Sequence, residues 1–138
     1  MNLSREECFE IVSTADKEDI LRIGKVIENK HNITVTRLEN MLLPLKAIDV
    51  KGIEFCLGDV LATECKVTVD KCEGYMLVLG DDKDKAYHGA IIDGYFGVSS
   101  EKEWLFNELE KIKYKLMRKV AEEIAKISDT KVEYEIID

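Results

Sequence analysis

The sequence has few of the features that mark self-contained catalytic and metal sites. Its eight glycines form neither a G-x-x-x-x-G-K-[ST] loop nor a glycine-rich strand-to-helix turn, so it has no phosphate-binding loop of the P-loop type. The two histidines, His31 and His88, stand in no H-E-x-x-H motif, and the four cysteines form no C-x-x-C pair. We therefore expect no metal, haem, flavin or other cofactor bound by this chain alone.

The sequence also has no long hydrophobic run and no excess of positive charge. Residues 1–10 include Arg5, Glu6 and Glu7 without an apolar stretch, which predicts neither a secretory signal nor a membrane span. Lys and Arg total 20 against 28 Asp and Glu, and the net charge of -8 disfavours binding to nucleic acid or to an anionic bilayer. We expect a cytoplasmic protein.

The four cysteines are expected to be reduced thiols, because disulfides are rare in a reducing compartment. They are predicted to serve packing, as free cysteine is among the most buried residue types. They are Cys8, Cys56, Cys65 and Cys72.

The composition is that of a globular protein. Of the 138 residues, 46% are hydrophobic and 35% charged, which is too apolar for disorder and too charged for a membrane protein. A chain of this length usually forms one core. We expect a single domain over residues 1–138.

Capping residues and three-to-four spacing of apolar residues predict two helices at the N-terminus. Ser4 and Glu7 form a capping box that begins a helix over about 5–14. Asp16 is placed to cap a second helix that ends near Asn32.

An alternation with a period of two then predicts strands. Strands are expected over 33–38 and 43–47, and Pro44 places the second at a sheet edge. Gly58 and Asp59 predict a bulge before the strand over 61–69. The continuous apolar run over 75–79 is predicted to be the central strand.

The last part of the sequence returns to helical patterns. Asp81 or Asp82 is placed to cap a small-residue helix that lies flat on the sheet, and a long helix is expected over 100–126, followed by a strand over 131–137. The predicted fold class is α+β: an antiparallel sheet meander with an N-terminal helical hairpin, a packing helix, and a long C-terminal helix followed by a strand.

The long helix carries one apolar stripe that is longer than a small sheet face requires. Its basic residues alternate with acidic ones and are expected to form a solvated, ion-pairing face. Two interpretations of the stripe stay open: burial in the chain's own core, or association through this helix and the closing strand, including a two-fold homodimer. The stripe consists of Leu105, Leu109, Ile112, Leu116, Val120, Ile124 and Ile127.

Two polar clusters are candidates for chemistry. In the first, Asp81, Asp82 or Asp93 could orient His88 as a general base, although helix caps and a surface histidine explain the same residues. In the second, the Gly58 bend could aim Asp59 and Glu64 into a site.

The structural alternative for the second cluster is a plain ion pair. Glu64 and Lys66 are same-face neighbours on the predicted strand and could simply pair in solvent. Asp59, Glu64 and His88 are therefore the candidate site residues.

Three segments carry a resemblance to a known family. The sequences LGDVLATECKV at 57–67, GYMLVLGDD at 74–82 and AIID at 90–93 resemble, in order and spacing, the PhnG family of the carbon–phosphorus lyase system. The early helix and the closing TKVEY at 130–134 extend the similarity to both ends. The chain departs from the family pattern over 40–52 and at Gly94, where alanine is common.

The resemblance implies a place in an assembly that degrades phosphonates, with PhnI, PhnH and PhnJ, and with PhnL. In that system the G, H and I proteins, with PhnL, are associated with the formation of α-D-ribose 1-methylphosphonate 5-triphosphate from ATP and methylphosphonate, which releases adenine. The nucleosidase-type step belongs to PhnI and the radical cleavage to PhnJ. The G subunit would be a non-autonomous part of this transferase, and ATP a substrate of the complex.

The resemblance does not decide how such a subunit acts. The chain could be a scaffold that completes PhnI, or it could contribute Asp59, Glu64 or His88 to an active site shared with PhnI. A stand-alone module that binds a small ligand is the third alternative.

Overall fold

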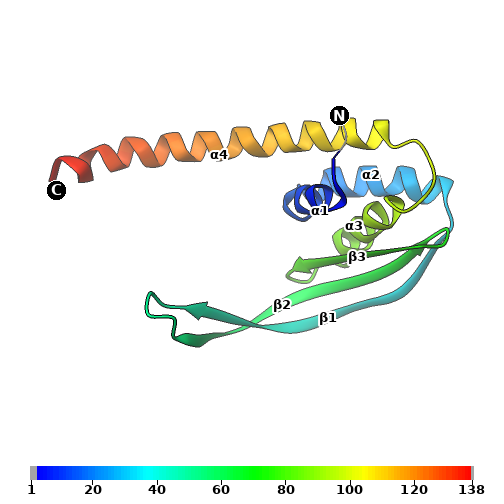
Figure 1. Cartoon of the computed structure of the whole chain (residues 1–138), viewed down its shortest axis with the longest axis horizontal. Helices are drawn as coiled ribbons and strands as arrows, with labels where there is room; N and C mark the ends of the chain where they lie inside the picture. The colour runs from blue at the N-terminus through cyan, green and yellow to red at the C-terminus, as the bar shows by residue number, and fades with distance from the viewer. Residues whose placement is uncertain (1–2, 138) are drawn as a thin grey trace.

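The computed structural model describes the backbone of residues 3–137 and the side chains of residues 3–126. Helices gather on one side of a three-stranded antiparallel sheet, as Figure 1 shows, and this confirms the predicted α+β class. The elements are α1 (Arg5–Thr14), α2 (Lys17–Lys30), β1 (Ile33–Ile48), β2 (Glu54–Val69), β3 (Cys72–Leu79), α3 (Lys83–Tyr95) and α4 (Glu103–Ile137).

Two of the three predicted helix caps are made by side chains. The Glu7 amide donates to the Ser4 hydroxyl at 3.1 Å, which confirms the start of α1. The Lys85 amide donates to the Asp82 carboxylate at 3.2 Å and starts α3. Asp16 occupies the N-cap position of α2, but its carboxylate makes no cap bond and instead pairs with Lys115 at 2.9 Å.

The sheet has the order β1-β2-β3, so β1 is an edge strand and Pro44 lies in it as predicted. The two strands expected around Pro44 are one strand, because an edge strand need not donate at every amide. The bulge at Gly58 is confirmed: Leu45 pairs with Gly58 and Lys46 with Cys56, which leaves Leu57 without a partner in the ladder. Gly58 has a φ of 127°, a conformation that favours glycine.

The prediction that residues 75–79 form the central strand was wrong. They belong to β3, which pairs only with β2, and β2 is central. Burial in β3 alternates, with Met76 and Val78 buried and Leu79 exposed. The apolar run therefore faces helices on one side only, which periodicity alone does not reveal.

The two pairings of β2 differ in length. Pairing with β3 ends at Ala62 and Leu79, whereas pairing with β1 continues to Glu54 and Ile48. The far half of the sheet is therefore a two-stranded ribbon, which extends beyond α1, α2 and α3 in Figure 1. We call residues 42–61 the distal ribbon.

Small residues allow α3 to lie flat on the sheet, as the sequence predicted. A Cβ atom on Gly74 of β3 would lie 2.1 Å from the carbonyl oxygen of Ala90 and 2.5 Å from the amide nitrogen of Gly94. Only glycine permits so close an approach of two backbones. α2 packs on α3, and α4 lies across α1 and α2 on the side away from the sheet (Figure 1).

The expected closing strand over 131–137 is contradicted, because these residues continue α4, which ends at Ile137. The sequence over 103–137 contains neither glycine nor proline. A helix that is already formed extends at little cost through residues that lack a breaker, and this outweighs the β-propensity of Val132, Tyr134 and Ile136.

Candidate functional site

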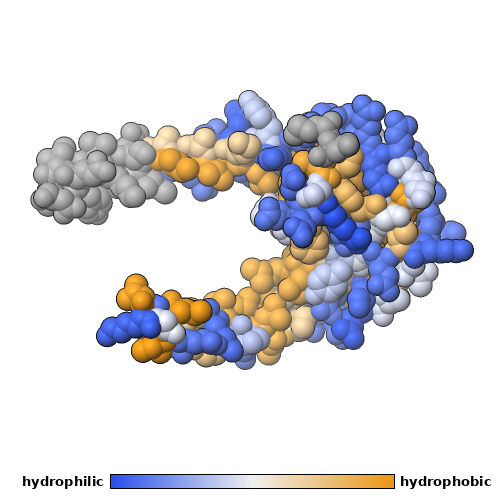
Figure 2. Space-filling view, viewed as in Figure 1, coloured by the Kyte–Doolittle hydropathy of each residue, from blue (hydrophilic) through white to orange (hydrophobic). Residues whose placement is uncertain are grey.

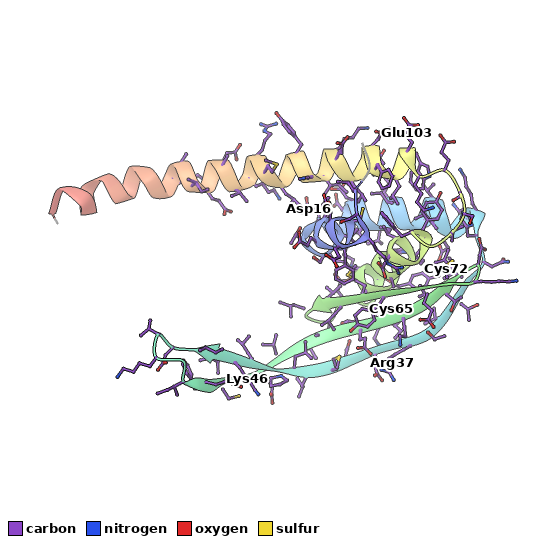
Figure 3. The ribbon with its side chains drawn as sticks, viewed as in Figure 1. Asp16, Arg37, Lys46, Cys65, Cys72 and Glu103 are labelled. Carbon is purple, nitrogen blue, oxygen red and sulfur yellow. The ribbon has the colours of Figure 1, made fainter. Side chains whose placement is uncertain are left out.

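The three candidate site residues lie in three different environments and do not form one site. Asp59 is exposed in the distal ribbon, opposite Pro44. Glu64 lies further along β2 on the face of the sheet away from the helices, and His88 is buried on α3. Figure 3 shows the scale of the separation along the sheet, with Lys46 in the ribbon far from Cys65 under the helices.

His88 is a core residue, which corrects its interpretation as a surface residue. It is 6% exposed and packs against α2, and the Tyr87 ring meets it edge-on at 5.0 Å. Its Nδ1 atom is buried without a hydrogen-bond partner. Burial lowers the pKa of the imidazole below its ordinary value, so the neutral ring is favoured.

Glu64 belongs to a small polar cluster on the outer face. Its carboxylate accepts bonds from the Arg37 guanidinium at 2.9 Å and from the Tyr75 hydroxyl at 2.8 Å. These bonds hold the pKa of Glu64 below its usual range. Glu64 therefore forms its ion pair with Arg37 on β1 and not with Lys66, as was expected. Figure 3 labels Arg37 on the sheet.

None of the aspartates proposed to orient His88 does so. Asp93 accepts from the Arg5 guanidinium at 3.0 and 3.1 Å and from the Tyr75 amide at 2.9 Å. Asp82 caps α3 and pairs with Lys17 at 2.9 Å, and Asp81 accepts from the Asn40 amide group at 3.1 Å. These carboxylates join elements far apart in the sequence, which is a structural role.

Sequence reasoning missed one histidine–carboxylate contact. His31 Nδ1 lies 2.7 Å from the Asp70 carboxylate, which also accepts from the Asn32 amide at 3.0 Å. The pKa of Asp70 is lowered, first by the Asn32 amide and then by His31. Asp70 lies at the tight turn between β2 and β3 and has a φ of 56°. This place at a turn is the one feature of the sequence that could have indicated the contact with His31.

The cysteines do not assemble into a reactive or metal-binding group. All four are free thiols, with Cys8 and Cys65 buried, Cys72 partly buried and Cys56 exposed. Burial raises the pKa of Cys8 to about 12 and that of Cys65 to about 11, which suppresses their thiolates. Among the described residues, no group of three or more His, Cys, Asp or Glu side chains is placed to hold a metal ion.

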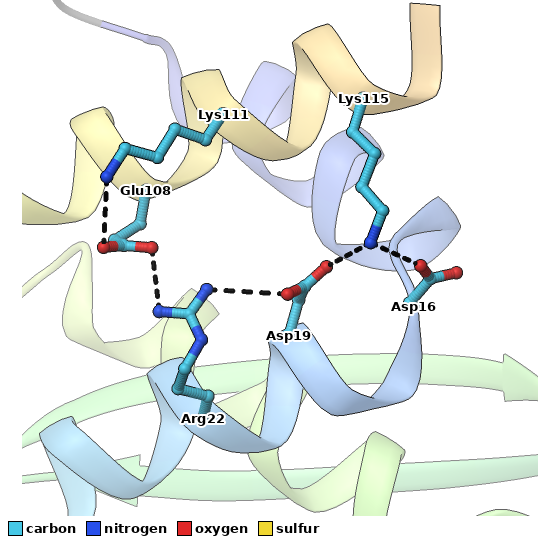
Figure 4. Close-up of polar contacts among 6 residues, drawn as sticks. All are labelled: Asp16, Asp19, Arg22, Glu108, Lys111 and Lys115. Carbon is cyan, nitrogen blue, oxygen red and sulfur yellow. Dashed lines mark hydrogen bonds and ion pairs between the residues drawn. The ribbon is translucent and has the colours of Figure 1, made fainter. Parts of the chain in front are cut away.

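Basic residues of α4 do form ion pairs, and their partners are Glu108 of α4 itself, Asp16 at the N-cap of α2 and Asp19 within α2. Lys115 bridges Asp16 at 2.9 Å and Asp19 at 3.4 Å, while Arg22 of α2 reaches Glu108 of α4 at 2.8 Å (Figure 4). These contacts join α4 to α2 and its N-cap.

The apolar stripe of α4 divides into two parts. Leu105, Leu109 and Ile112 are buried in the core of the chain, so this part is ordinary packing. Leu116 packs against the edge of that core, whereas Val120 and Ile124 beyond it are 54% and 56% exposed. Ile127, the last residue of the stripe, lies outside the described side chains.

Comparison with protein families decides what kind of chain this is. The family model described as "Phosphonate metabolism protein PhnG" matches residues 3–137. The chain belongs to the PhnG family. A comparison with curated proteins found no match.

Membership of the PhnG family gives the chain a role in phosphonate metabolism. In the described residues, no helix is both long and apolar enough to span a bilayer. Of the candidate site residues, Glu64 is bonded to Arg37 and Tyr75 and His88 is buried, whereas Asp59 and the apolar side chains beyond the core are exposed. For this member of the PhnG family, the exposed apolar surfaces are thus the features left without a structural explanation.

Proposed function

We propose that this member of the PhnG family is a cytoplasmic, non-autonomous subunit of the carbon–phosphorus lyase complex. It supports formation of α-D-ribose 1-methylphosphonate 5-triphosphate from ATP and methylphosphonate, a reaction that releases adenine. Its role is to complete the PhnI subunit, which performs the chemical step. PhnH-, PhnJ- and PhnL-like proteins are the further partners.

The observation that carries this proposal is the exposure of large apolar side chains outside the core. Val120 and Ile124 continue a stripe whose first half is buried, and Leu42 and Leu61 in the ribbon are 63% and 42% exposed. Contiguous exposed apolar surface on a protein in water marks a surface that another molecule covers. A subunit held in a complex explains it.

The electrostatics of the chain support the division of labour. A triphosphate needs several cationic donors or a metal ion for binding. The chain has a net charge of -8, and Arg5, Arg22 and Arg37 are each bound to carboxylates of the same chain. This supports an arrangement in which the groups that hold the triphosphate come from another subunit.

The alternative in which the chain supplies a side chain to a shared site is best represented by Glu64. It is only partly buried, and with Tyr75 it forms a polar pair on the open face of the sheet. His88 is a poorer choice because its ring is enclosed by α2 and α3. Glu64→Gln separates the two roles, since it keeps the size of the side chain and removes its charge.

The small-ligand alternative has less support from the hollows of the structure. One hollow is lined by Lys113, Leu116, Met117, Val120, Ala121 and Ile124, all on α4. It runs along a single helix, and no polar groups converge on it from other elements. Ligand pockets normally enclose most of the ligand between several elements.

Complex formation is the direct test of the partner assignment. The chain is coexpressed with the PhnH, PhnI and PhnJ proteins of its own system, with an affinity tag on PhnI, and the complex is separated by size. We expect the chain to elute with PhnI in a fixed ratio. Elution of the untagged chain alone, with PhnI complete and active without it, would contradict the proposal.

A further inference from the structure

The chain exposes much more surface than its mass requires. Its accessible surface is 9373 Å² for a mass of 15.8 kDa. A compact monomer of this mass exposes roughly 7,300 Å², so the excess is roughly 2,000 Å². A standard interface covers only about 800 Å² of each partner, and obligate interfaces cover more. An excess of this size shows that the chain is far from a compact globule and leaves surface available to a partner.

Two projecting arms account for the extended shape. One arm is the distal ribbon, residues 42–61, and the other is the part of α4 over 113–126, which we call the distal helix. Figure 2 shows that the arms project from the same side of the molecule and that the space between them is open. Hydrophobic residues lie on both arms along the sides that face this space.

Strand register explains why apolar residues of the ribbon face the helix. Cys65 and Thr63 of β2 are buried on the helical side of the sheet, and alternation puts Leu61 on that same side. Leu42 is the ladder partner of Leu61 and shares its face. The leucine pair therefore points toward the side on which α4 lies.

Three of the five charged side chains of the ribbon are engaged within it. Lys46 pairs with Glu54 at 2.9 Å across the two strands. Asp49 accepts from the amides of Lys51 and Ile53, each at 2.9 Å, and so closes the turn. A molecule that covers this arm has few charges to match and mainly apolar surface to bury.

A second copy of the chain fits the space poorly. Two copies that interlock would place each distal helix between a helix and a ribbon, so it would need apolar residues on opposite sides. The distal helix is apolar at Met117 and Val120, but its other side carries Arg118, Lys119 and Glu122. Two chains of charge -8 would also repel each other.

We infer that the distal ribbon and the distal helix together hold one polypeptide element of a different protein, apolar on two opposite sides. Such an element touches α4 with one side and the ribbon with the other. It belongs to a partner subunit whose surface beside the distal helix is neutral or acidic, since residues 113–126 carry five basic side chains against two acidic ones. The inference rests on the proposed function, and it assigns the surface through which the subunit is held.

Charge substitution on each arm tests the joint contact. Val120→Glu/Ile124→Glu changes the distal helix and Leu42→Glu/Leu61→Glu changes the ribbon; all four side chains are at least 42% exposed, so the fold should tolerate them. Arg118→Glu places the same side chain on the charged side of α4 as a control. Binding to purified PhnI is measured by calorimetry, and circular dichroism confirms the fold.

We expect each arm variant to weaken binding at least about tenfold, and Arg118→Glu to change it less than about threefold. A complex with PhnI that tolerates the substitutions on either arm would overturn the inference and leave the proposed function standing. If wild-type chain does not bind PhnI but forms a dimer that the arm variants dissociate, both fail.

Crosslinking decides whether the arms hold the same element. A photoreactive phenylalanine analogue replaces Met117 in one variant and Leu61 in another, and the crosslinked peptides of PhnI are identified by mass spectrometry. The two positions should capture one continuous segment of PhnI on its opposite sides. Capture of separate segments or of different chains would show that the arms work independently, which contradicts a joint contact.

Discussion

Gly24 of α2 lies directly against the imidazole of His88 on α3. A Cβ atom at position 24 would stand 2.6 Å from both Nδ1 and Cβ of His88, closer than real Cβ contacts allow. The contact brings two helices together under α4, which also joins α2 through ion pairs. The contact thus helps to form the helical layer on which α4 packs.

Gly24→Ala should destabilise the fold despite the better helix propensity of alanine. Overpacking at a tight contact costs about 1–3 kcal/mol, against a propensity gain of at most about 1 kcal/mol. Urea unfolding followed by circular dichroism measures the difference. Lys25→Ala, an exposed change at the next position of the same helix, is the control and should stay within about 0.5 kcal/mol of wild type. Equal stability of Gly24→Ala and wild type would show that the helices separate easily.

His88 should make the fold less stable as the pH falls. Burial lowers its pKa in the folded state below the ordinary value of 6.5, so below that value the unfolded chain binds a proton that the folded chain does not. The contribution of His88 to the free energy of unfolding should be constant above about pH 7 and decline as the pH falls through 6.5. Urea unfolding at a series of pH values on both sides of this range gives the slope. In His88→Gln the slope should be smaller, and an unchanged slope would assign it to other groups.

The cysteines should react with a thiol reagent in a fixed order. Cys56 is exposed and should react first in the native protein at mildly alkaline pH. Cys8 and Cys65 should react only after unfolding, because they are buried and their pKa values are raised to about 12 and about 11. Mass spectrometry after timed labelling identifies each site. Denaturation without a reductant should release four thiols, and a smaller number would reveal a disulfide.

Asp82→Ala should destabilise α3 more than Asp81→Ala does. Asp82 accepts from the Lys85 amide as the helix cap and pairs with Lys17, whereas Asp81 accepts only from the exposed Asn40 side chain. Loss of an aspartate cap costs about 1 kcal/mol. Thermal unfolding of both variants gives the comparison. The cap has no special role if Asp81→Ala proves as harmful.

The sequence predicted the local features whose signals are short. Ser4 and Glu7 identified the start of α1, Pro44 the edge strand and Gly58 the bulge, because each restricts the backbone by its own chemistry. The α+β class followed from the order of these elements.

The errors concern features that depend on which residues meet in space. Residues 75–79 resembled a central strand because an apolar run does not show how many strands flank it, and residues 131–137 resembled a strand because local alternation ignores the helix already formed before them. The burial of His88 depends on Gly24, which lies far away in the sequence. No local pattern records such a contact.

The candidate site shows the same limit. Glu64 was identified as a polar residue of interest, but its partners Arg37 and Tyr75 come from the two neighbouring strands, and only the register brings them together. Its bonds could not be assigned before the register was known.

Adenine release from ATP and methylphosphonate is the measurement that tests the central claim most directly. PhnH, PhnI and PhnL are purified without this chain and assayed with wild-type chain, with Glu64→Gln, with Asp59→Asn or with no addition. We predict that the reaction requires the chain and that both variants restore it to within about twofold of wild type, because complexation and not a side chain of this subunit is what PhnI needs. A loss of about a hundredfold or more in turnover with Glu64→Gln or Asp59→Asn, in a complex that still assembles, would contradict the account and assign a catalytic residue to this chain.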